Sequence, residues 1–534
     1  MKLSIAQINA TVGDFAGNAA KILEYVSLAK KEGSELVVFP ELAVTGYPPE
    51  DLLLKPKFIK DNLACLKSIA GSIKGITACV GFVDQAGKSI YNACAVISEG
   101  RVSQVYRKII LPNYGVFDEK RYFSQGEKPL VIDIAGIKLG LNICEDIWFE
   151  EGPAKQQSRA GAKAIITLNA SPYHAGKVKE REAIIQKQAK SNGVSVIYAN
   201  MVGGQDELVF DGYSMAVDGN GTVAARAEGF KEELLTFELS ADGKISGGIK
   251  AKRPEPAGEV YAALTLGVKD YFAKNGFKKA VIGLSGGIDS AIVSCIAVDA
   301  LGRENVTCVF MPSEFSSNDS LEDARVLAGN LGIKFLEISI QEIFKEYLSV
   351  LNPHFEGKHP DITEENLQAR IRGNYMMALS NKFGWLVLTT GNKSEMSTGY
   401  ATLYGDMAGG FAVIKDVPKL LVYAISEYRN SVSTAIPRRI LTKAPTAELR
   451  HNQKDSDSLP PYEILDPILK LYVEEDRDAK EIVAEGFEEK TVYRVLGLVD
   501  RSEYKRRQSP PGVKITPKAF GRDRRVPITN KYKS

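Results

Sequence analysis

Hydrophobic and polar residues alternate along the first half of the chain in a way that predicts strands and helices in turn. The helical spacing of apolar residues in 17–33, which end at a glycine, predicts a helix, and 158–171 predict a helix end followed by a strand. Strand-like stretches run over 2–9, 35–41, 76–83, 92–109, 137–146 and 194–202, with turns expected at Gly87 and Gly100. The order helix, small-residue turn, apolar strand occurs at 30–41 and again at 158–171. This fits either a repeated α-β unit or the similarity that any two such segments of an α/β protein share.

The pattern restarts after a stretch that is typical of a linker. Residues 245–260 combine glycines, two prolines and alternating charges. Beyond them, helices and strands alternate again, at 259–276, 278–287, 289–302, 306–312, 320–332 and 335–340. This period predicts a parallel, doubly wound sheet. We therefore expect two α/β domains, 1–245 and 259–534, joined by a linker at 246–258.

Composition and charge narrow the class of protein. The 534 residues are 44% hydrophobic and 25% charged, which excludes collagen-like, coiled-coil and disordered chains. With 68 basic against 66 acidic residues the net charge is +2, so we expect no nucleic-acid partner and no membrane partner. No apolar run reaches the roughly 18 residues of a membrane span, and the N-terminus lacks a signal-peptide pattern. Six scattered cysteines and four histidines form no CxxC or HxxxH pair, so we expect a cytoplasmic protein without a zinc site.

Although the net charge of the whole chain is near zero, its C-terminal segment is strongly basic. Residues 501–534 hold eleven Lys or Arg and two acidic residues, a net charge of +9. Aromatic residues (Tyr504, Phe520 and Tyr532) lie among these charges, a pattern that RNA-binding proteins also show. An RNA-binding function is therefore one hypothesis, which a filter-binding assay in physiological salt would test.

Three reactive side chains lie at the ends of three apolar segments in the first half. Glu41 follows LVVFP, Lys108 follows VSQVYR and Cys144 follows LGLNI. Because strand ends in α/β folds converge on a cleft, these residues could meet in space. A thiol needs deprotonation to attack a carbonyl, an ammonium lowers its pKa, and a carboxylate can accept its proton. Taken singly, each residue is more often structural or solvated than catalytic.

The surrounding segments FPELAVTGYPPED, YRKIILPNYGVFDEKRYF and NICEDIWF resemble the three active-site segments of the nitrilase (carbon–nitrogen hydrolase) superfamily. The resemblance covers about 1–240 and implies an α-β-β-α sandwich with Glu41 as general base, Lys108 as stabiliser of the tetrahedral intermediate and Cys144 as nucleophile. It implies Glu119 as a second carboxylate beside them, and the backbone N–H after Cys144 is a candidate oxyanion donor. For glutamine as substrate it implies contacts from Tyr114, Ser171 and Lys177.

In the second half, SGGIDS lies between an apolar strand and an apolar helix. Two glycines allow a tight turn, Ser285 and Ser290 offer hydroxyls, and the helix N-terminus offers N–H groups, which together predict a phosphate-binding loop. The loop matches neither GxxxxGK[ST] nor GxGxxG. Asp289 within the turn indicates magnesium beside the phosphates.

SGGIDS is similar to the signature of the N-type ATP pyrophosphatases, and LTTGNKSEMSTGYATLYGDMAGGF (388–411) and ENLQARIRGNYMMALSN (365–381) resemble segments of the NAD synthetase family. The resemblance covers about 260–510. For magnesium it implies Asp289 and Glu395. For ATP it implies Leu284, Ser285, Gly286, Gly287, Ile288, Asp289, Ser290, Ala291 and Thr398. For deamido-NAD it implies Arg370, Arg372, Asn374, Asp406 and Lys505.

Joined together, the two halves resemble the glutamine-dependent NAD synthetase family. The resemblance implies amidation of deamido-NAD with ATP and glutamine as co-substrates, magnesium as cofactor, and a homo-oligomer. Ammonia made from glutamine would travel inside the protein, because ammonium has no lone pair with which to attack. Two other enzymes remain open: an amidase with a vestigial nucleotide-binding domain, and a different amidotransferase of the pyrophosphatase class.

Two segments keep more than one interpretation. The basic segment beyond Lys505 fits a solvated tail or subunit contact as well as steering of anionic substrates. Residues 451–466 are polar and proline-rich, and we expect a mobile loop near the substrate there.

Overall fold

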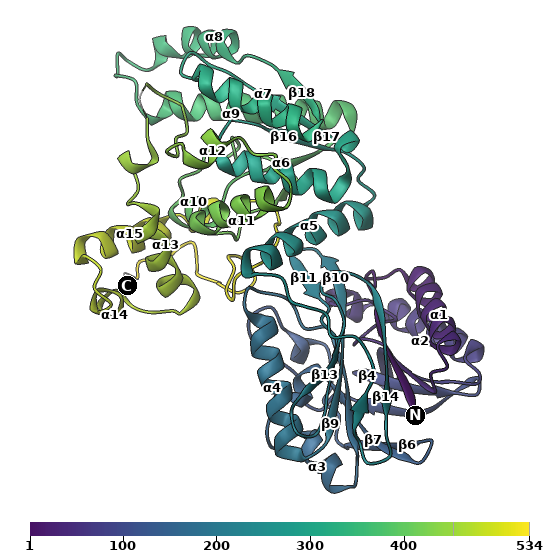
Figure 1. Ribbon diagram of the computed structural model, residues 1–534. Coiled ribbons are helices and arrows are strands. Elements are labelled where there is room, and N and C mark those ends of the chain that lie inside the picture. The colour runs from purple at the N-terminus through teal and green to yellow at the C-terminus, as the bar shows by residue number, and fades with distance from the viewer. Residues whose placement is uncertain (452, 533–534) are drawn as a thin grey trace. The chain divides into compact units, whose positions relative to one another are not determined.

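The computed structural model describes residues 1–451 and 453–532. The chain forms two compact units, Met1–Pro254 and Glu255–Ser534. Figure 1 shows strands between helices in each of them. Within the described ranges, no helix has both the length and the apolar character needed to cross a membrane.

Two sheets build the N-terminal unit. The seven-stranded sheet has the order β15 (Ile245–Ser246), β14 (Glu233–Leu239), β1 (Lys2–Gln7), β2 (Leu36–Val38), β3 (Thr77–Ala86), β4 (Ser89–Ser98) and β5 (Arg101–Arg107). The six-stranded sheet has the order β13 (Val223–Arg226), β12 (Met215–Val217), β9 (Ser195–Asn200), β8 (Ala164–Asn169), β7 (Ile137–Ile143) and β6 (Leu130–Ile134). A separate hairpin pairs β10 (Val202–Gln205) with β11 (Leu208–Asp211).

The alternation of side chains explains how these sheets stack. Leu3 and Ile5 of β1 share a fully buried core with Leu139 and Leu141 of β7, so the two sheets pack face to face. Helices α1 (Phe15–Lys31) and α2 (Pro56–Ser72) cover the outer face of the first sheet. Helices α3 (Pro153–Arg159) and α4 (Lys177–Asn192) cover the second. The expected α-β-β-α sandwich is confirmed.

A five-stranded parallel sheet forms the centre of the C-terminal unit. Its order is β18 (Lys334–Glu337), β17 (Val306–Phe310), β16 (Ala280–Gly283), β19 (Leu386–Thr389) and β20 (Phe411–Ala412). Helix α6 (Ile288–Leu301) contacts β16 and β17, and α9 (Ile362–Phe383) packs Met376 against Val281. The expected doubly wound parallel sheet is confirmed. The other longer helices are α5 (Pro256–Asn275), α7 (Asn318–Leu331), α8 (Gln341–Leu351) and α11 (Lys419–Val432).

The C-terminal helices have a core of their own. It contains side chains from α13 (Tyr462–Leu469), α14 (Ala479–Ala484) and α15 (Glu489–Arg501), together with Phe520. The expectation of a loop over 451–466 is wrong at its end, because α13 begins at Tyr462 and buries Leu465 completely. The apolar spacing continues beyond 466 to Ile468 and Leu469, and only that longer window shows its helical period.

The first part of the basic segment is folded onto this unit, whereas residues 527–532 are exposed to solvent. Ser502 Oγ donates to Thr398 O, and Arg506 donates to Ser397 O at 2.7 Å, so they cap the short helix α10 (Lys393–Thr398). Lys505 Nζ donates to the carbonyls of Gly399 and Ala401, both at 2.8 Å. Ion pairs bind Lys514 to Asp523 and Lys518 to Asp476, whereas Lys533 lies outside the described residues.

Candidate active sites

A buried lysine is the centre of the first site. Lys108 follows β5 directly, and its Nζ donates to Glu41 Oε1 and to Glu119 Oε1, both at 2.8 Å. All three side chains are buried. Burial of the ammonium is tolerated because two carboxylates receive it. Those carboxylates raise the pKa of Lys108 against the opposing effect of burial, so it stays charged.

Glu41 is held by donors on both of its oxygens. Asn92 Nδ2 donates to Oε1 at 2.6 Å, and the backbone N–H of Ala170 donates to Oε2 at 2.9 Å. The segment that carries Glu41 runs so close to β3 that a Cβ on Gly81 would lie 2.4 Å from Leu42 N. The carboxylate therefore has a fixed orientation, as a general base requires.

Cys144 lies where β7 turns into a short 3-10 helix, Cys144–Ile147. Its φ is +47°, a left-handed conformation that costs a non-glycine residue about 1–2 kcal/mol. Burial and then the charge of Glu41 raise the pKa of the thiol well above its usual range, while Lys108 lowers it. The thiol is thus neutral at rest, and a neighbouring base must take its proton before it can attack.

Glu119 is the carboxylate of this site whose protonation changes near neutral pH. Burial raises its pKa to about 7, with Lys108 opposing and Glu41 adding to the rise. Tyr47 donates its hydroxyl to Oε1 at 3.0 Å. Within the described part of the chain, buried Oε2 has no hydrogen-bond partner, so it can receive one from a ligand.

The three residues expected to bind glutamine border this group. Tyr114 is 57% exposed and donates its hydroxyl to both oxygens of Glu145 at 3.0 Å. Lys177 begins α4, with Nζ 4.2 Å from the centre of the Trp148 ring, and burial lowers its pKa. Ser171 is buried directly after Ala170, the residue that binds Glu41.

A buried ion pair holds the backbone around Ser171. The Ser171 N–H donates to Asn200 Oδ1 at 3.0 Å, and Ser171 O accepts a weak bond of 3.5 Å from Arg181. Arg181 also donates to Asp211 at 3.0 and 3.3 Å, and both side chains are fully buried. Asn200 Nδ2 donates to Asp211 as well, which closes the network.

Sequence reasoning missed the partners of these residues. Asn92, Glu145, Asp146 and Arg181 were not predicted. Arg181 lies in a strongly polar helix, whereas the other three are polar or charged residues within largely apolar segments. Such an interruption is the signal that could have identified those three, because a buried polar group needs a specific partner.

The second site begins at the turn between β16 and α6. Gly286 has a φ of +78°, and a Cβ there would lie 2.4 Å from Ser320 O. The Gly287 N–H donates to Ser285 Oγ at 3.3 Å, and Ser290 Oγ donates to Gly287 O at 3.0 Å. These bonds fix a tight loop at the N-terminus of a fourteen-residue helix, where an anion is favoured.

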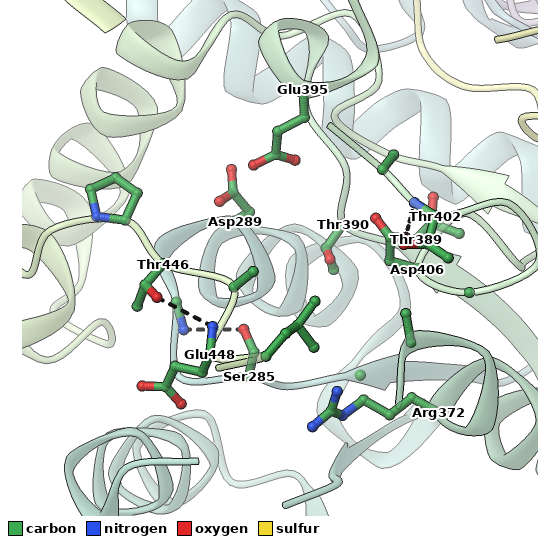
Figure 2. A pocket seen from close by; sticks show the side chains of 18 of the residues that line it. Ser285, Asp289, Arg372, Thr389, Thr390, Glu395, Thr402, Asp406, Thr446 and Glu448 are labelled. Carbon is green, nitrogen blue, oxygen red and sulfur yellow. Dashed lines mark hydrogen bonds between the residues drawn. The ribbon is translucent and has the colours of Figure 1, made fainter. Parts of the chain in front are cut away.

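The carboxylates of Asp289 and Glu395, the two residues expected to hold magnesium, point toward each other beside this loop (Figure 2). Lys419 donates to Asp289 and lies 3.5 Å from Glu395 Oε1. Burial and then the charge of Asp289 raise the pKa of Glu395 to about 8, with Lys419 opposing. Although burial opposes it, the two carboxylates raise the pKa of Lys419.

This donor set fits Mg²⁺. The ion is usually bound by one or two carboxylates together with substrate phosphates and water. Asp289 and Glu395 would supply the carboxylates, and the loop would supply the place for phosphates. Among the described residues, no group of three or more His, Cys, Asp or Glu side chains forms a complete protein-only metal site.

A pocket of about 410 Å³ extends from the loop. Its lining includes Thr389, the last residue of β19, Thr390 directly after it, and Arg372 from α9. Figure 2 shows Arg372 on the side of the pocket opposite to Glu395. Of the residues expected to bind magnesium, ATP or deamido-NAD, the lining contains Leu284, Ser285, Gly286, Gly287, Ile288, Asp289, Glu395, Arg372, Asp406 and Lys505. It does not contain Ser290, Ala291, Thr398, Arg370 or Asn374.

The period of α9 explains which of its residues reach the pocket. Ile362, Glu365, Ala369, Arg372 and Met376 line it at helical spacing. Arg370 and Asn374 are four residues apart and lie on another face, where Arg370 donates to Leu403 O and Asn374 is exposed.

Thr398 is turned into its own helix. Its hydroxyl donates to Ser394 O at 3.0 Å, and the side chain is buried. Arg372 donates Nε to Met311 O at 3.0 Å, and burial lowers its pKa to about 10. Asp406 Oδ1 accepts from the Thr402 N–H at 2.7 Å.

A loop that the sequence did not identify covers one side of the pocket. Thr446 and Glu448 lie in this loop in Figure 2. Glu448 Oε1 accepts from Ser317 and Ser320 at the start of α7, and from Lys443 at 3.1 Å. Lys419 was missed too, although a lysine as the first residue of a helix is unfavourable by itself and signals a specific partner.

Family models match both halves of the chain. A carbon-nitrogen hydrolase model matches residues 2–243, and an NAD synthase model matches residues 260–509. Each match falls within one of the two compact units.

Full-length relatives carry the same pair of halves. The chain is 50% identical to a "Glutamine-dependent NAD(+) synthetase" of Thermotoga maritima, covering 100% of this chain and 99% of that protein. It is 46% identical to the protein of that name from Aquifex aeolicus, covering 100% of both. A solved structure of the Acinetobacter baumannii glutamine-dependent NAD+ synthetase in complex with ADP superposes with a TM-score of 0.82 at 44% identity, covering 99% of this chain and 98% of that one. These matches support the fused enzyme rather than an amidase with a vestigial appendage.

Proposed function

The chain belongs to the family of glutamine-dependent NAD(+) synthetases, and from that premise we propose that it amidates deamido-NAD to NAD+ with ATP and glutamine. The products are NAD+, AMP, pyrophosphate and glutamate. The observation that supports this best is the presence of two separate reactive centres in one chain. Lys108 bridges two carboxylates close to Cys144 in one unit. In the other, Asp289 at the end of a glycine loop and Glu395 both lie against Lys419.

Glutamine is hydrolysed in the N-terminal unit. Glu41 takes the thiol proton as Cys144 attacks the side-chain amide, and Lys108 stabilises the charge that develops on the amide oxygen. The amide nitrogen leaves as ammonia with a proton from a carboxylic acid, for which Glu119 is suited by its pKa of about 7. Water then hydrolyses the thioester to glutamate.

Glutamine is a zwitterion, so its recognition needs one group of each charge. We assign its carboxylate to Lys177 and its ammonium to Glu145, which Tyr114 orients. Ser171 contacts the substrate beside the backbone that holds Glu41. The burial of Glu145 and of Lys177 strengthens both charge pairs relative to solvent.

The C-terminal unit activates the acceptor, because a free carboxylate resists attack by an amine. The nicotinate carboxylate of deamido-NAD attacks the α-phosphorus of ATP and pyrophosphate leaves. The loop Ser285–Asp289 cradles the phosphates, and Lys419 adds a positive charge beside them. Magnesium held by Asp289 and Glu395 would neutralise phosphate charge. Ammonia then displaces AMP to form the amide.

The remaining expected residues are proposed as substrate contacts. Arg372, Asp406 and Lys505 line the same pocket as the loop and would bind deamido-NAD there. Arg370 and Asn374 face away from that pocket, so we propose that they contact a part of deamido-NAD that extends outside it. Thr398 would support ATP binding by holding α10.

All six cysteines are free thiols, as suits the reducing cytoplasm that we propose as the setting of this reaction. We also propose a homo-oligomer, which light scattering on the purified protein would test.

One assay tests the division of labour. Purified protein with ATP, Mg²⁺, deamido-NAD and glutamine should yield NAD+, AMP and glutamate in equal amounts. Cys144→Ala should abolish the reaction with glutamine and leave the reaction with ammonium chloride at high pH. Cys65→Ala, which removes a half-buried thiol on α2, is the matched control and should leave both reactions unchanged. Loss of both reactions in Cys144→Ala would contradict the proposal.

A further inference from the structure

One buried carboxylate has no task in the reaction described above. Asp146 lies two residues after Cys144, and its side chain is completely buried. Its Oδ1 accepts from the backbone N–H groups of Ile109 and Ile110, at 3.1 and 2.8 Å. Its Oδ2 accepts from Tyr106 Oη at 2.7 Å and from the Ile143 N–H at 3.0 Å.

The four donors come from two different parts of the chain. Tyr106, Ile109 and Ile110 surround Lys108 in sequence, whereas Ile143 is the residue directly before Cys144. The carboxylate therefore joins the end of the strand that carries the lysine to the end of the strand that carries the thiol. β5 and β7 belong to different sheets, so no ladder hydrogen bond sets this relative position.

We propose that Asp146 is a positioning residue for glutamine hydrolysis, which fixes the thiol of Cys144 relative to the ammonium of Lys108. The inference rests on the proposed function. Asp146 does not touch the substrate; it acts through Ile143 and through the backbone after Lys108. The left-handed backbone conformation of Cys144 explains why such a residue is needed. A strained conformation persists only where the surrounding structure holds the adjacent residues in place.

Only a carboxylate satisfies all four donors at once. Asparagine has one accepting oxygen, so in Asp146→Asn the amide nitrogen must face one of the two pairs of donors. If the oxygen keeps Ile109 and Ile110, the Ile143 N–H faces an amide donor and loses its acceptor. If the amide is flipped, the backbone after Lys108 loses its acceptor instead. Either orientation frees one of the two reacting side chains to shift.

The test compares Asp146→Asn with wild-type protein in three measurements. Glutamine-driven NAD+ formation should fall about 100-fold in kcat with little change in the KM for glutamine, because misplacement of reacting groups by about 1 Å has a cost of that size. Ammonia-driven NAD+ formation should be unchanged. Alkylation of Cys144 by iodoacetamide, followed by mass spectrometry of its peptide, should slow and shift to higher pH, although the charged neighbours Glu41, Lys108, Glu119 and Glu145 are all retained.

Tyr106→Phe is the graded variant, because it removes one of the four hydrogen bonds and keeps the carboxylate. It should lower the glutamine-driven kcat about 3- to 10-fold. If Asp146→Asn does not fold, a loss in Tyr106→Phe that is confined to the glutamine-driven reaction still supports the proposal. The proposal would be overturned if both variants had the wild-type kcat and the wild-type rate of alkylation. It would also be overturned if the variants lost as much NAD+ synthesis with ammonia as with glutamine. If wild-type protein makes no NAD+ at all, the proposed function fails, whereas the alkylation of Cys144 still decides the role of Asp146.

Discussion

Replacing Arg181 by methionine should destabilise the N-terminal unit strongly. The substitution leaves the carboxylate of Asp211 buried without its counter-charge, since both side chains are fully buried in the wild-type protein. Removing one partner of such a pair costs about 3–5 kcal/mol. At about 2–4 °C per kcal/mol for a unit of this size, the thermal midpoint should fall by about 6–20 °C. Scanning calorimetry, read at the transition of residues 1–254, measures this directly.

A second substitution identifies the cause. In the double variant Arg181→Met/Asp211→Asn the buried charge is gone and the side-chain oxygen can still accept from Asn200, so most of the loss should be recovered. Arg438→Met, which breaks an exposed pair with Glu427 in the other unit, should change the midpoint little. Because Arg181 also donates to Ser171 O, the Arg181→Met variant should show a raised KM for glutamine at temperatures below its thermal transition. A fall of under about 2 °C, or a double variant no more stable than the single one, would refute this reasoning.

Three further outcomes are expected. The pKa of Glu119 rises from 4.5 to about 7 on folding, so the stabilisation that its protonation provides is complete below pH 4.5 and is lost as the pH rises through 7. Between pH 4.5 and 7 the urea midpoint should therefore fall less in Glu119→Gln than in the wild-type protein. Parallel plots of urea midpoint against pH for the two proteins would contradict this. Gly286→Ala places a methyl group against Ser320 O at a positive φ, and should abolish ATP binding in equilibrium dialysis while glutamine hydrolysis persists. Arg506→Met leaves the carbonyl of Ser397 without this donor, at about 1–3 kcal/mol, whereas Val499 O still accepts from the Ser502 N–H; the variant should lower the thermal midpoint of the C-terminal unit but not that of the N-terminal one.

Local pattern was enough to predict the elements that carry the reactive residues. β7 and the turn after it place Cys144 at the end of an apolar stretch. The strand-loop-helix pattern around SGGIDS corresponds to β16, the loop after it and α6. The first signal covers residues 137–147 and the second residues 280–301, and over such short ranges side-chain period and turn chemistry determine the local structure.

Contacts between distant segments could not be predicted in this way. Lys419 lies 130 residues from Asp289 in sequence, and Asp146 accepts from residues 36 to 40 positions away. Their partners depend on how the strands are ordered in space. The finding that Arg372 lines the pocket while Arg370 and Asn374 do not is a different case, because it follows from local geometry. Residues two apart on a helix point in different directions. The period alone could have predicted that these three do not share one pocket.

The dependence of α10 on residues 502–506 has a consequence for synthesis on the ribosome. The N-terminal unit ends at residue 254, whereas Ser502 and Arg506, which cap α10, are translated about 250 residues later (502 − 254 = 248). At about 5–20 residues per second, the 280 residues of the second unit take roughly 15–55 s to translate. During that interval a nascent chain already contains every residue of the thiol centre but not the residues that cap α10. On the proposed function, glutamine hydrolysed in this window would yield ammonia without a completed acceptor site on the same chain.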